Sequence, residues 1–311
     1  MTAVTLHPMG EDFVAEVGDV DLSHPLAAAD LDGIKQAFAK YAVLVFPDQV
    51  LSHDQHLAFA EHFGPLETSI GVYRTDVAPR ARPELSDISN LTADGQLWSR
   101  DSRIRRYKAG NRLWHTDSSF KFVPARASLL YARAIPPVGG HTQFADCRAA
   151  YDALPAATKT RIRQLVAEHS VFHSRARIGF ADWVEAERDN LESVPQVLCR
   201  RVAGSDRYSL YVASHAGRIF GMDEKAGRAL IDELLAHATQ PRFVHTHRWR
   251  VGDLVMWDDR CTLHRGTEYD DLRWRRDMFR ATVSDEINTC VREGVDLPED
   301  YRREARAETA R

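Results

Sequence analysis

The chain has few cysteines and no long apolar segment. Its cysteines, Cys147, Cys199, Cys261 and Cys290, lie far apart without a CxxC pair, which argues against a disulfide framework and a cysteine zinc site. No run of about 18 apolar residues occurs, and residues 1–10 lack a basic stretch followed by an apolar one. We therefore expect a cytoplasmic protein with reduced thiols that neither crosses a membrane nor is secreted.

A surplus of basic charge is also missing. The 41 Lys and Arg residues face 45 Asp and Glu residues, giving a formal net charge of -4. Proteins that bind DNA or RNA neutralise phosphates with an excess of Lys and Arg, so a nucleic-acid partner is disfavoured. The length of 311 residues allows a sizeable core without disulfides or a structural metal.

The chain shows no repeat, low-complexity tract or linker, which predicts a single domain over residues 1–311. Helical spacing of apolar residues predicts helices, and short apolar or alternating runs predict strands. Ser52 and Gln55 form a capping box at the start of one helix, which Gly64 and Pro65 should end. The helices are expected at 30–41, 52–64, 155–168 and 223–238, and the strands at 13–22, 42–46, 128–134, 242–249, 254–257 and 274–283.

Three further segments complete the prediction. Residues 136–140 should form a turn, residues 68–112 are polar and are expected to form a mobile loop or lid, and the charged residues 293–311 should form a frayed or helical tail. The last three strands are expected to be antiparallel with short connections. Together these elements indicate an α+β fold around an antiparallel barrel or sandwich.

A candidate metal site lies in the segment LWHTDSSF. His115 and Asp117 are two residues apart, so in an extended backbone both side chains project to one side. A second histidine, for which His264 is the best candidate, would complete the two-histidine, one-carboxylate triad of non-haem Fe(II) oxygenases. His245 and His247 also share a strand face, but no carboxylate nearby completes a triad, so we interpret them as structural. A surface or capping pair at 115–117 is the competing interpretation.

A cluster of arginines follows in RWRRDMFRATV. Arg276, Met278 and Arg280 share one face of a strand, with the two arginine Cα atoms roughly 13 Å apart at about 3.3 Å per residue. Buried guanidinium groups require anions, so an inward pair predicts carboxylate ligands held by both groups. A solvated basic edge strand is the alternative.

Three segments occur in a fixed order: LWHTDSSF, VGGHTQFADCRAAYDALP, and WDDRCTLHRG followed by RRDMFRAT. Together they resemble the taurine/dichlorophenoxyacetate dioxygenase family of Fe(II)- and 2-oxoglutarate-dependent oxygenases. The resemblance covers residues 17–283, and ELSDISN, ELLAHATQ and HRWRVGDLVMWDDRC are most similar to the dichlorophenoxyacetate branch. It implies a double-stranded β-helix, or jelly roll, with flanking and inserted helices.

The resemblance also implies roles for individual residues. It assigns His115, Asp117 and His264 to iron, Thr142 and Arg276 to 2-oxoglutarate, Arg280 to the active-site anions of both cosubstrate and substrate, and Asn111 and His215 to the substrate region. Asn111 has an equally good interpretation as a turn residue. Asp259 departs from the family, which usually has Asn after Trp-Asp; its carboxylate would either add negative charge near the metal or face solvent.

The implied reaction uses Fe(II), 2-oxoglutarate and O2 to hydroxylate a small anionic substrate. For an aryloxyacetate such as 2,4-dichlorophenoxyacetate, hydroxylation beside the ether oxygen gives a hemiacetal that collapses to a phenol and glyoxylate. The alternatives are an alkylsulfonate (taurine-like) or natural-product dioxygenase of the same family, and a non-catalytic, cupin-like metal or small-molecule binding protein. A purely structural protein is the least favoured. The oligomeric state, a homo-oligomer included, stays open.

Overall fold

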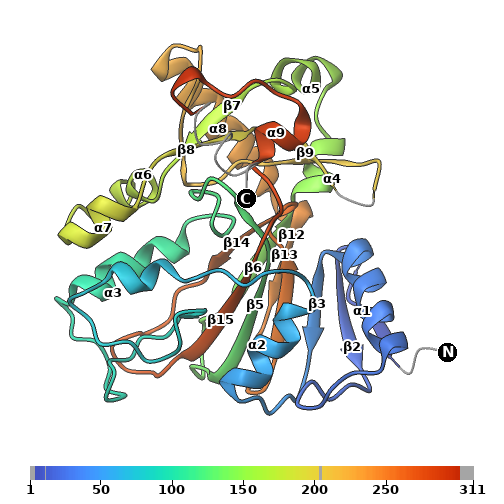
Figure 1. Ribbon diagram of the computed structural model, residues 1–311, viewed down its shortest axis with the longest axis vertical. Coiled ribbons are helices and arrows are strands. Elements are labelled where there is room, and N and C mark those ends of the chain that lie inside the picture. Colours follow the sequence, from blue (N-terminus) through green and yellow to red (C-terminus); the bar gives the residue numbers. More distant parts are fainter. Residues whose placement is uncertain (1–3, 11, 203–204, 302–311) are drawn as a thin grey trace.

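The computed structural model describes residues 4–10, 12–202 and 205–301 (Figure 1). The strands are β1 (Thr5–Pro8), β2 (Val14–Gly18), β3 (Val43–Phe46), β4 (Leu85–Asp87), β5 (Ala125–Ala134), β6 (Thr142–Asp146), β7 (Val166–His169), β8 (Val194–Val197), β9 (Cys199–Arg201), β10 (Tyr208–Leu210), β11 (Ala216–Ile219), β12 (Val244–His247), β13 (Leu254–Asp258), β14 (Thr262–Gly266) and β15 (Asp277–Ser284). The α-helices are α1 (Ala28–Tyr41), α2 (His53–Glu61), α3 (Arg103–Lys108), α4 (Cys147–Asp152), α5 (Ala156–Ile162), α6 (Val171–Ala176), α7 (Glu185–Asn190), α8 (Glu224–Ala238) and α9 (Thr289–Glu293). Short 3-10 helices are η1 (Ile70–Tyr73), η2 (Ala109–Arg112), η3 (Pro241–Phe243) and η4 (Glu299–Tyr301).

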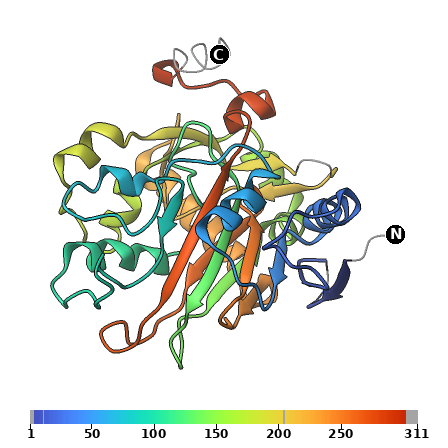
Figure 2. The ribbon, with the colours of Figure 1, turned by 60° about the horizontal axis from the view of Figure 1, so that its bottom comes forward.

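Two sheets form the centre of the fold. One has seven strands in the order β1-β2-β3-β13-β5-β15-β4, and the other has three in the order β12-β6-β14. The long strands β5 and β15 lie side by side and antiparallel (Figure 2). In the large sheet only β2 and β3 pair in parallel, and all other neighbours are antiparallel. The α+β content that the sequence predicts is present.

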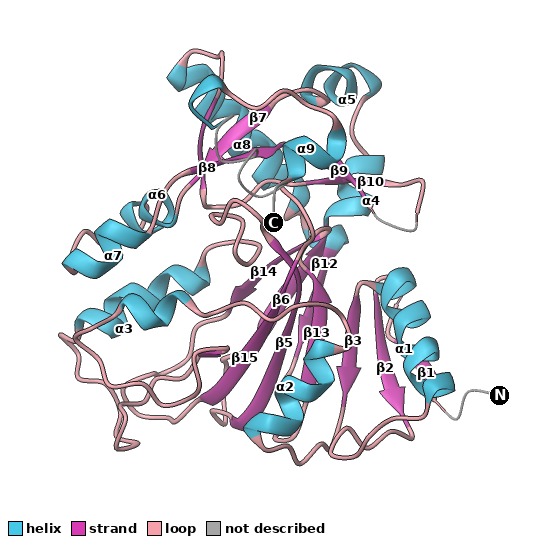
Figure 3. Ribbon diagram, in the orientation of Figure 1, coloured by secondary structure: helices cyan, strands magenta, loops and turns pink. Residues whose placement is uncertain are grey.

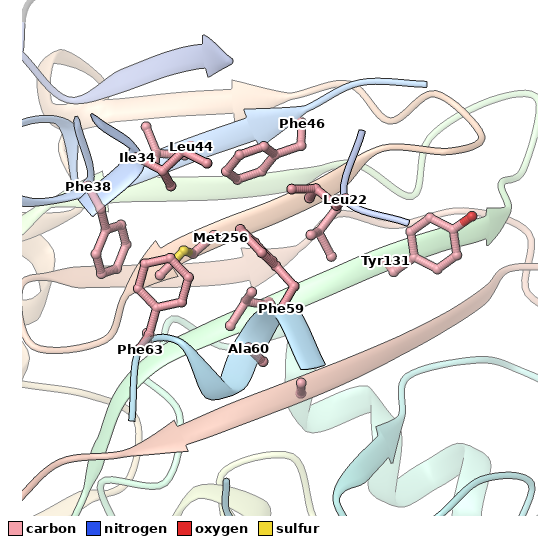
Figure 4. Packing of buried hydrophobic residues seen from close by; sticks show 14 of the residues in the cluster. Leu22, Ile34, Phe38, Leu44, Phe46, Phe59, Ala60, Phe63, Tyr131 and Met256 are labelled. Carbon is pink, nitrogen blue, oxygen red and sulfur yellow. The ribbon is translucent and has the colours of Figure 1, made fainter. Parts of the chain in front are cut away.

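Alternate residues of the central strands face opposite sides of the seven-stranded sheet, as the strand period of two requires. Helices α1 and α2 pack against one side, where the core is formed by Ile34, Phe38, Leu44, Phe46, Phe59, Phe63, Tyr131 and Met256 (Figure 4). The core on the other side is formed by Val43, Val45, Leu130, Val255, Trp257 and Met278, together with Phe144 of β6. The second core therefore lies between the two sheets, and Arg280 of β15 points to this side with Met278.

A largely helical insertion between β6 and β12 packs over one end of the two sheets (Figure 3). It contains α4 to α8 and two small sheets, β11-β7-β8 and β10-β9. Leu198, Leu210, Ile231 and Leu234 form its buried core with Leu263 of β14. The insertion is thus fixed to the strand that carries His264. Among the described residues, no helix is long and apolar enough to cross a membrane.

Most of the predicted elements are confirmed within a few residues. The helix capped by Ser52 is α2, and its capping box with Gln55 is formed. The turn at 136–140 is present and needs glycine, because Gly139 has φ +75° and a Cβ atom there would lie 2.3 Å from the Glu268 carbonyl oxygen. The turn also places the Gly140 carbonyl within 3.4 Å of Arg276 Nε.

Three predictions were wrong in part. The helix predicted over 155–168 ends at Ile162 and is followed by β7, because residues 166–169 pair with β8 and β11. Residues 68–112 are not one loop, since they contain η1, β4, α3 and η2. Strands β12 and β13 have the predicted short connection but do not pair with each other, because they lie in different sheets. Most of the predicted tail, residues 302–311, lies outside the described residues.

The buried imidazole of His56 makes stability depend on pH. Its Nε2 hydrogen-bonds the Leu129 carbonyl oxygen at 3.0 Å, and burial lowers its pKa from 6.5 to about 4. The native state therefore excludes a proton that the unfolded chain binds, and stability falls as the pH drops from about 6.5 to about 4. Without this imidazole, the His56→Gln variant should lose less free energy of unfolding between about pH 6.5 and pH 4 than the wild type does, by on the order of 3 kcal/mol. Urea unfolding at several pH values measures it, with the exposed His62→Gln as control; an unchanged pH profile in His56→Gln would contradict the assignment.

Candidate metal centre

Two backbone hydrogen bonds bring the three predicted ligands together. The His115 N–H donates to the His264 carbonyl at 3.0 Å, and the His264 N–H donates to the His115 carbonyl at 2.7 Å. His264 lies on β14 opposite Phe144, and therefore faces the space between the two sheets. Asp117 follows two residues after His115, and one possible ligand atom from each of the three side chains lies within 4.8 Å of the others.

The donor atoms of this cluster suit a divalent transition metal. His115 Nδ1 donates to the Leu113 carbonyl at 2.7 Å, which leaves the lone pair on Nε2. The Nε2 atoms of His115 and His264 lie 3.9 and 3.6 Å from the Asp117 carboxylate oxygens. Burial lowers the pKa of both imidazoles, which keeps them neutral, as metal ligation requires. Two imidazoles and one carboxylate are the ligand set of non-haem Fe(II) sites.

The Asp117 carboxylate is held by two neighbours. Arg280 donates to one of its oxygens in a close ion pair, and Ser128 Oγ lies 2.8 Å from the other. Burial alone would raise the pKa of Asp117, but the charge of Arg280 and the hydrogen bond from Ser128 lower it below its usual value. The carboxylate is therefore ionised and oriented toward the histidines. Arg280 neutralises part of its charge.

Asp259 corrects one expectation drawn from the sequence, because it does not face solvent. Its side chain is fully buried, and burial together with the Asp117 carboxylate raises its pKa well above the usual range. Asp259 Oδ1 accepts hydrogen bonds from the Asp117 N–H and from Trp257 Nε1, both at 3.0 Å. Its other oxygen, Oδ2, lies 2.7 Å from Ser128 Oγ.

Counting protons fixes the direction of these bonds. The Ser128 hydroxyl has one hydrogen but contacts both Asp117 Oδ2 and Asp259 Oδ2. When Ser128 donates to the ionised Asp117, its contact with Asp259 requires a hydrogen on Asp259 Oδ2. A protonated carboxyl group thus donates where an asparagine amide would donate. Asp259, which stands where the family usually has Asn, can therefore keep the same hydrogen bonds to Ser128 and Asp117.

Two cavities meet at the metal centre. The larger has a volume of about 570 Å³ and the smaller about 110 Å³. His115, Asn111, Lys108 and Arg280 line both. Asp117 and His215 line only the larger cavity, whereas His264, Thr142 and Arg276 line only the smaller. The predicted site residues therefore gather around this junction, each within one or both cavities.

The smaller cavity contains a buried cation without a counter-charge. Arg276 donates to the Ile88 carbonyl at 3.1 Å, and within the described part of the chain no carboxylate pairs with it. Burial lowers its pKa. Thr142 Oγ1 accepts from Trp249 Nε1 at 3.0 Å at the same cavity. Strand β15 lies between β5 and β4, so the alternative of a solvated basic edge strand is wrong.

Four other histidine and asparagine residues were singled out in the sequence, and two of them line the cavities at the cluster. Asn111 Oδ1 accepts from Arg175 Nη2 at 3.3 Å, and His215 Nδ1 lies 3.1 Å from Ser119 Oγ. His247 pairs with Asp253 at 3.0 Å, a carboxylate that the sequence argument overlooked, and neither His245 nor His247 joins the metal cluster. Sequence reasoning missed Ser128 and Arg175, for which no motif or spacing gave a signal.

Comparison with known proteins shows the family to which the chain belongs. Residues 5–282 match the family described as "Taurine catabolism dioxygenase TauD, TfdA family", and the chain belongs to this family. It is 45% identical over 288 residues to the alpha-ketoglutarate-dependent 2,4-dichlorophenoxyacetate dioxygenase of Cupriavidus pinatubonensis, covering 92% of this chain and 98% of the relative. It is 35% identical to the (S)-phenoxypropionate/alpha-ketoglutarate-dioxygenase of Sphingobium herbicidovorans, over 91% and 95% of the two chains.

A solved structure agrees with these relatives. The crystal structure of AAD-2 in complex with Mn(II) and N-oxalylglycine superposes with a TM-score of 0.89 at 44% identity, covering 93% of this chain and all of that one. The predicted family is confirmed. The relatives that match most of the chain are named as 2-oxoglutarate-dependent dioxygenases, in agreement with the predicted enzyme class.

Replacing one histidine tests the metal cluster. His264→Ala should weaken Mn(II) or Co(II) binding by more than the roughly 10- to 100-fold that loss of an outer hydrogen-bond partner costs, because it removes a ligand. His245→Ala is the matched control, since His245 is partly buried but outside the cluster. Calorimetric titration of the metal-free protein measures both. Equal affinities in the two variants would contradict the ligand set.

The raised pKa of Asp259 predicts an effect on stability. In the metal-free protein, Asp259→Asn should keep the hydrogen bonds and gain stability over the wild type as the pH rises, because the raised native pKa of Asp259 makes its contribution decline with pH. Asp259→Leu removes the donor and the acceptors and should lose roughly 1–3 kcal/mol. Urea unfolding from about pH 5 to pH 8 measures both. A loss in Asp259→Asn that grows with pH would refute the protonated state.

Proposed function

We propose that the chain is an Fe(II)- and 2-oxoglutarate-dependent dioxygenase that hydroxylates an aryloxyacetate. The observation that carries this proposal is the junction of the two cavities at the cluster of His115, Asp117 and His264. These three side chains would hold Fe(II). The smaller cavity would take 2-oxoglutarate, and the larger one would take the substrate.

The residues of the smaller cavity suit a dicarboxylate. Arg276 has no carboxylate partner in the described protein and offers guanidinium donors to the distal carboxylate of 2-oxoglutarate, beside the Thr142 hydroxyl. The proximal end would then lie toward the metal centre. When bound, iron supplies the coupling of O2 reduction and 2-oxoglutarate decarboxylation to hydroxylation of the substrate.

The larger cavity suits an aromatic ring that carries a charged group. Many of its walls are apolar, with Ile70, Val72, Val77, Leu85, Ile104, Tyr107 and Phe120 among them. It also contains basic side chains and would exclude bulk water from the reacting carbon. Hydroxylation beside the ether oxygen consumes one O2 and one 2-oxoglutarate and releases succinate and CO2. Collapse of the hemiacetal gives a phenol and glyoxylate, in line with the substrates named for the relatives.

The path of the chain supports a jelly roll as the finer description of the fold. From β12 onward, successive strands alternate between the two central sheets: β12 and β14 belong to the small sheet, and β13 and β15 to the large one. This alternation is what winding a double-stranded β-helix requires. We interpret residues 1–311 as one catalytic domain of this kind. Within it, residues 68–112 would act as a lid, because residues 69–88 supply much of the wall of the larger cavity.

Product analysis tests the reaction. Purified protein with Fe(II), 2-oxoglutarate and O2 should form succinate faster when an aryloxyacetate is added, and should release the matching phenol in equal amount. A panel of aryloxyacetates, aryloxypropionates and alkylsulfonates separates the substrate classes by phenol and sulfite release. His115→Ala should abolish the stimulation, whereas His245→Ala should retain it.

Two outcomes would count against the proposal. Sulfite release without phenol would move the substrate to the alkylsulfonates. Metal and 2-oxoglutarate binding without any stimulated turnover would favour a binding protein.

A further inference from the structure

The larger cavity contains a buried arginine that no carboxylate neutralises. Arg175, near the end of α6, is only 6% exposed and lines this cavity. Its Nη1 atom donates to Ser174 Oγ at 3.0 Å and its Nη2 atom to Asn111 Oδ1 at 3.3 Å, while its Nε has no partner. A buried guanidinium without an anion is costly, which points to an anionic ligand.

Every other Arg or Lys side chain of this cavity already has a carboxylate within 3.7 Å. The pairs are Arg74 with Glu187, Arg80 with Asp87, Arg82 with Asp54, Lys108 with Asp87, Lys121 with Glu67, and Arg280 with Asp117. Among the described residues that line the cavity, Arg175 is therefore the one such cation with its charge uncompensated. Arg280, which the family resemblance assigns to the anions, is committed to the metal ligand Asp117.

The neighbours of Arg175 hold its guanidinium in place without consuming its charge. Its Cζ atom lies 4.4 Å from the centre of the Tyr107 ring, in cation–π contact. On another side it packs on Gly110, where a Cβ atom would lie 2.6 Å from the Arg175 side chain. Only a residue without a side chain leaves this space. The guanidinium is thus fixed before any ligand binds, which reduces the entropic cost of recognition.

We infer that Arg175 binds the anionic group of the substrate and selects an anion over a neutral analogue. The inference rests on the proposed function and names the group in the larger cavity that recognises the substrate carboxylate. Arg276 in the smaller cavity provides the parallel, because each cavity holds one buried arginine without a carboxylate. Asn111 acts as a positioning residue, since its side-chain oxygen orients Arg175 from the segment that leads to His115.

Binding without turnover tests the inference separately from the reaction. The protein is loaded with Mn(II) and N-oxalylglycine, and phenoxyacetate and its neutral analogue phenoxyacetamide are titrated by calorimetry. Arg175→Met should weaken phenoxyacetate binding by roughly 10- to 100-fold, the value of a charge-assisted hydrogen bond, and leave phenoxyacetamide binding within about threefold. Arg175→Lys should recover part of the affinity, because it keeps the charge but loses the paired donors.

A matched control and a steady-state measurement complete the design. Arg177→Met removes an exposed arginine two residues further along the chain that pairs with Asp232, and should change neither affinity. In turnover, Arg175→Met should raise the KM for the aryloxyacetate more than it lowers kcat. A variant that merely misfolds would lose both ligands equally and would also lose N-oxalylglycine binding.

The outcomes separate the two proposals. If the wild type prefers phenoxyacetate and Arg175→Met removes the preference, the inference holds even where no phenol is released, and only the proposed reaction fails. If phenol is released but Arg175→Met keeps the full preference, the inference is wrong and the proposed function survives. If the wild type shows no preference for the anion, Arg175 has no such role.

Discussion

The pair of backbone hydrogen bonds between His115 and His264 is the constraint on which the site depends. It ties a segment that belongs to neither sheet onto β14, so two predicted metal ligands that lie 149 positions apart in sequence become neighbours. Asp117 follows only two residues later, and its direction is set by Arg280 from the large sheet and by Ser128 from β5. The cluster is therefore built at the place where both sheets and the connecting segment meet. Its position follows from strand pairing.

The basic side chains around the two cavities fall into two groups, those paired with a carboxylate and those without one. Most basic side chains near the site are matched by carboxylates, which makes them part of the framework. Arg276 and Arg175 lack such partners in the described structure, and one lines each cavity. Burying a positive charge without an anion costs free energy, which is why we infer that the unmatched arginines bind anionic ligands. The same physical rule explains why burial beside the Asp117 carboxylate raises the pKa of Asp259.

Local patterns in the sequence predicted the regular elements well. The capping box of α2 and the apolar spacing of α1 and α8 depend on neighbours within a few residues, and all were found. Strand β7 was missed because its pairing with β8 and β11 comes from distant residues, which no local period reveals. The short elements β4 and α3 within the polar segment 68–112 were missed for the same reason.

The site shows the same division. The His-x-Asp spacing and the family motifs predicted that His115, Asp117 and His264 would gather, and the structure brings these three side chains together. Thr142 and Arg276, also predicted from the motifs, line the adjoining smaller cavity. The spacing and the motifs could not reveal that Arg280 would be paired with Asp117, or that Asp259 would be fully buried. Arg175 lies in a short helix of the insertion, and its unmatched charge becomes visible only once the partners of all its neighbours are known. Electrostatic compensation is a property of the folded assembly, and sequence spacing alone does not encode it.

The larger cavity is assembled from parts that are separate in the chain. Residues 69–88 contribute much of its apolar wall, α6 of the insertion contributes Arg175, and the predicted metal ligands come from the sheets and the segment joined to them. Substitutions in residues 69–88 can therefore change the size and shape of the cavity while the Arg175 side chain and the predicted metal ligands stay in place. Because each part belongs to a different stretch of the chain, evolution can vary one of them without rebuilding the others.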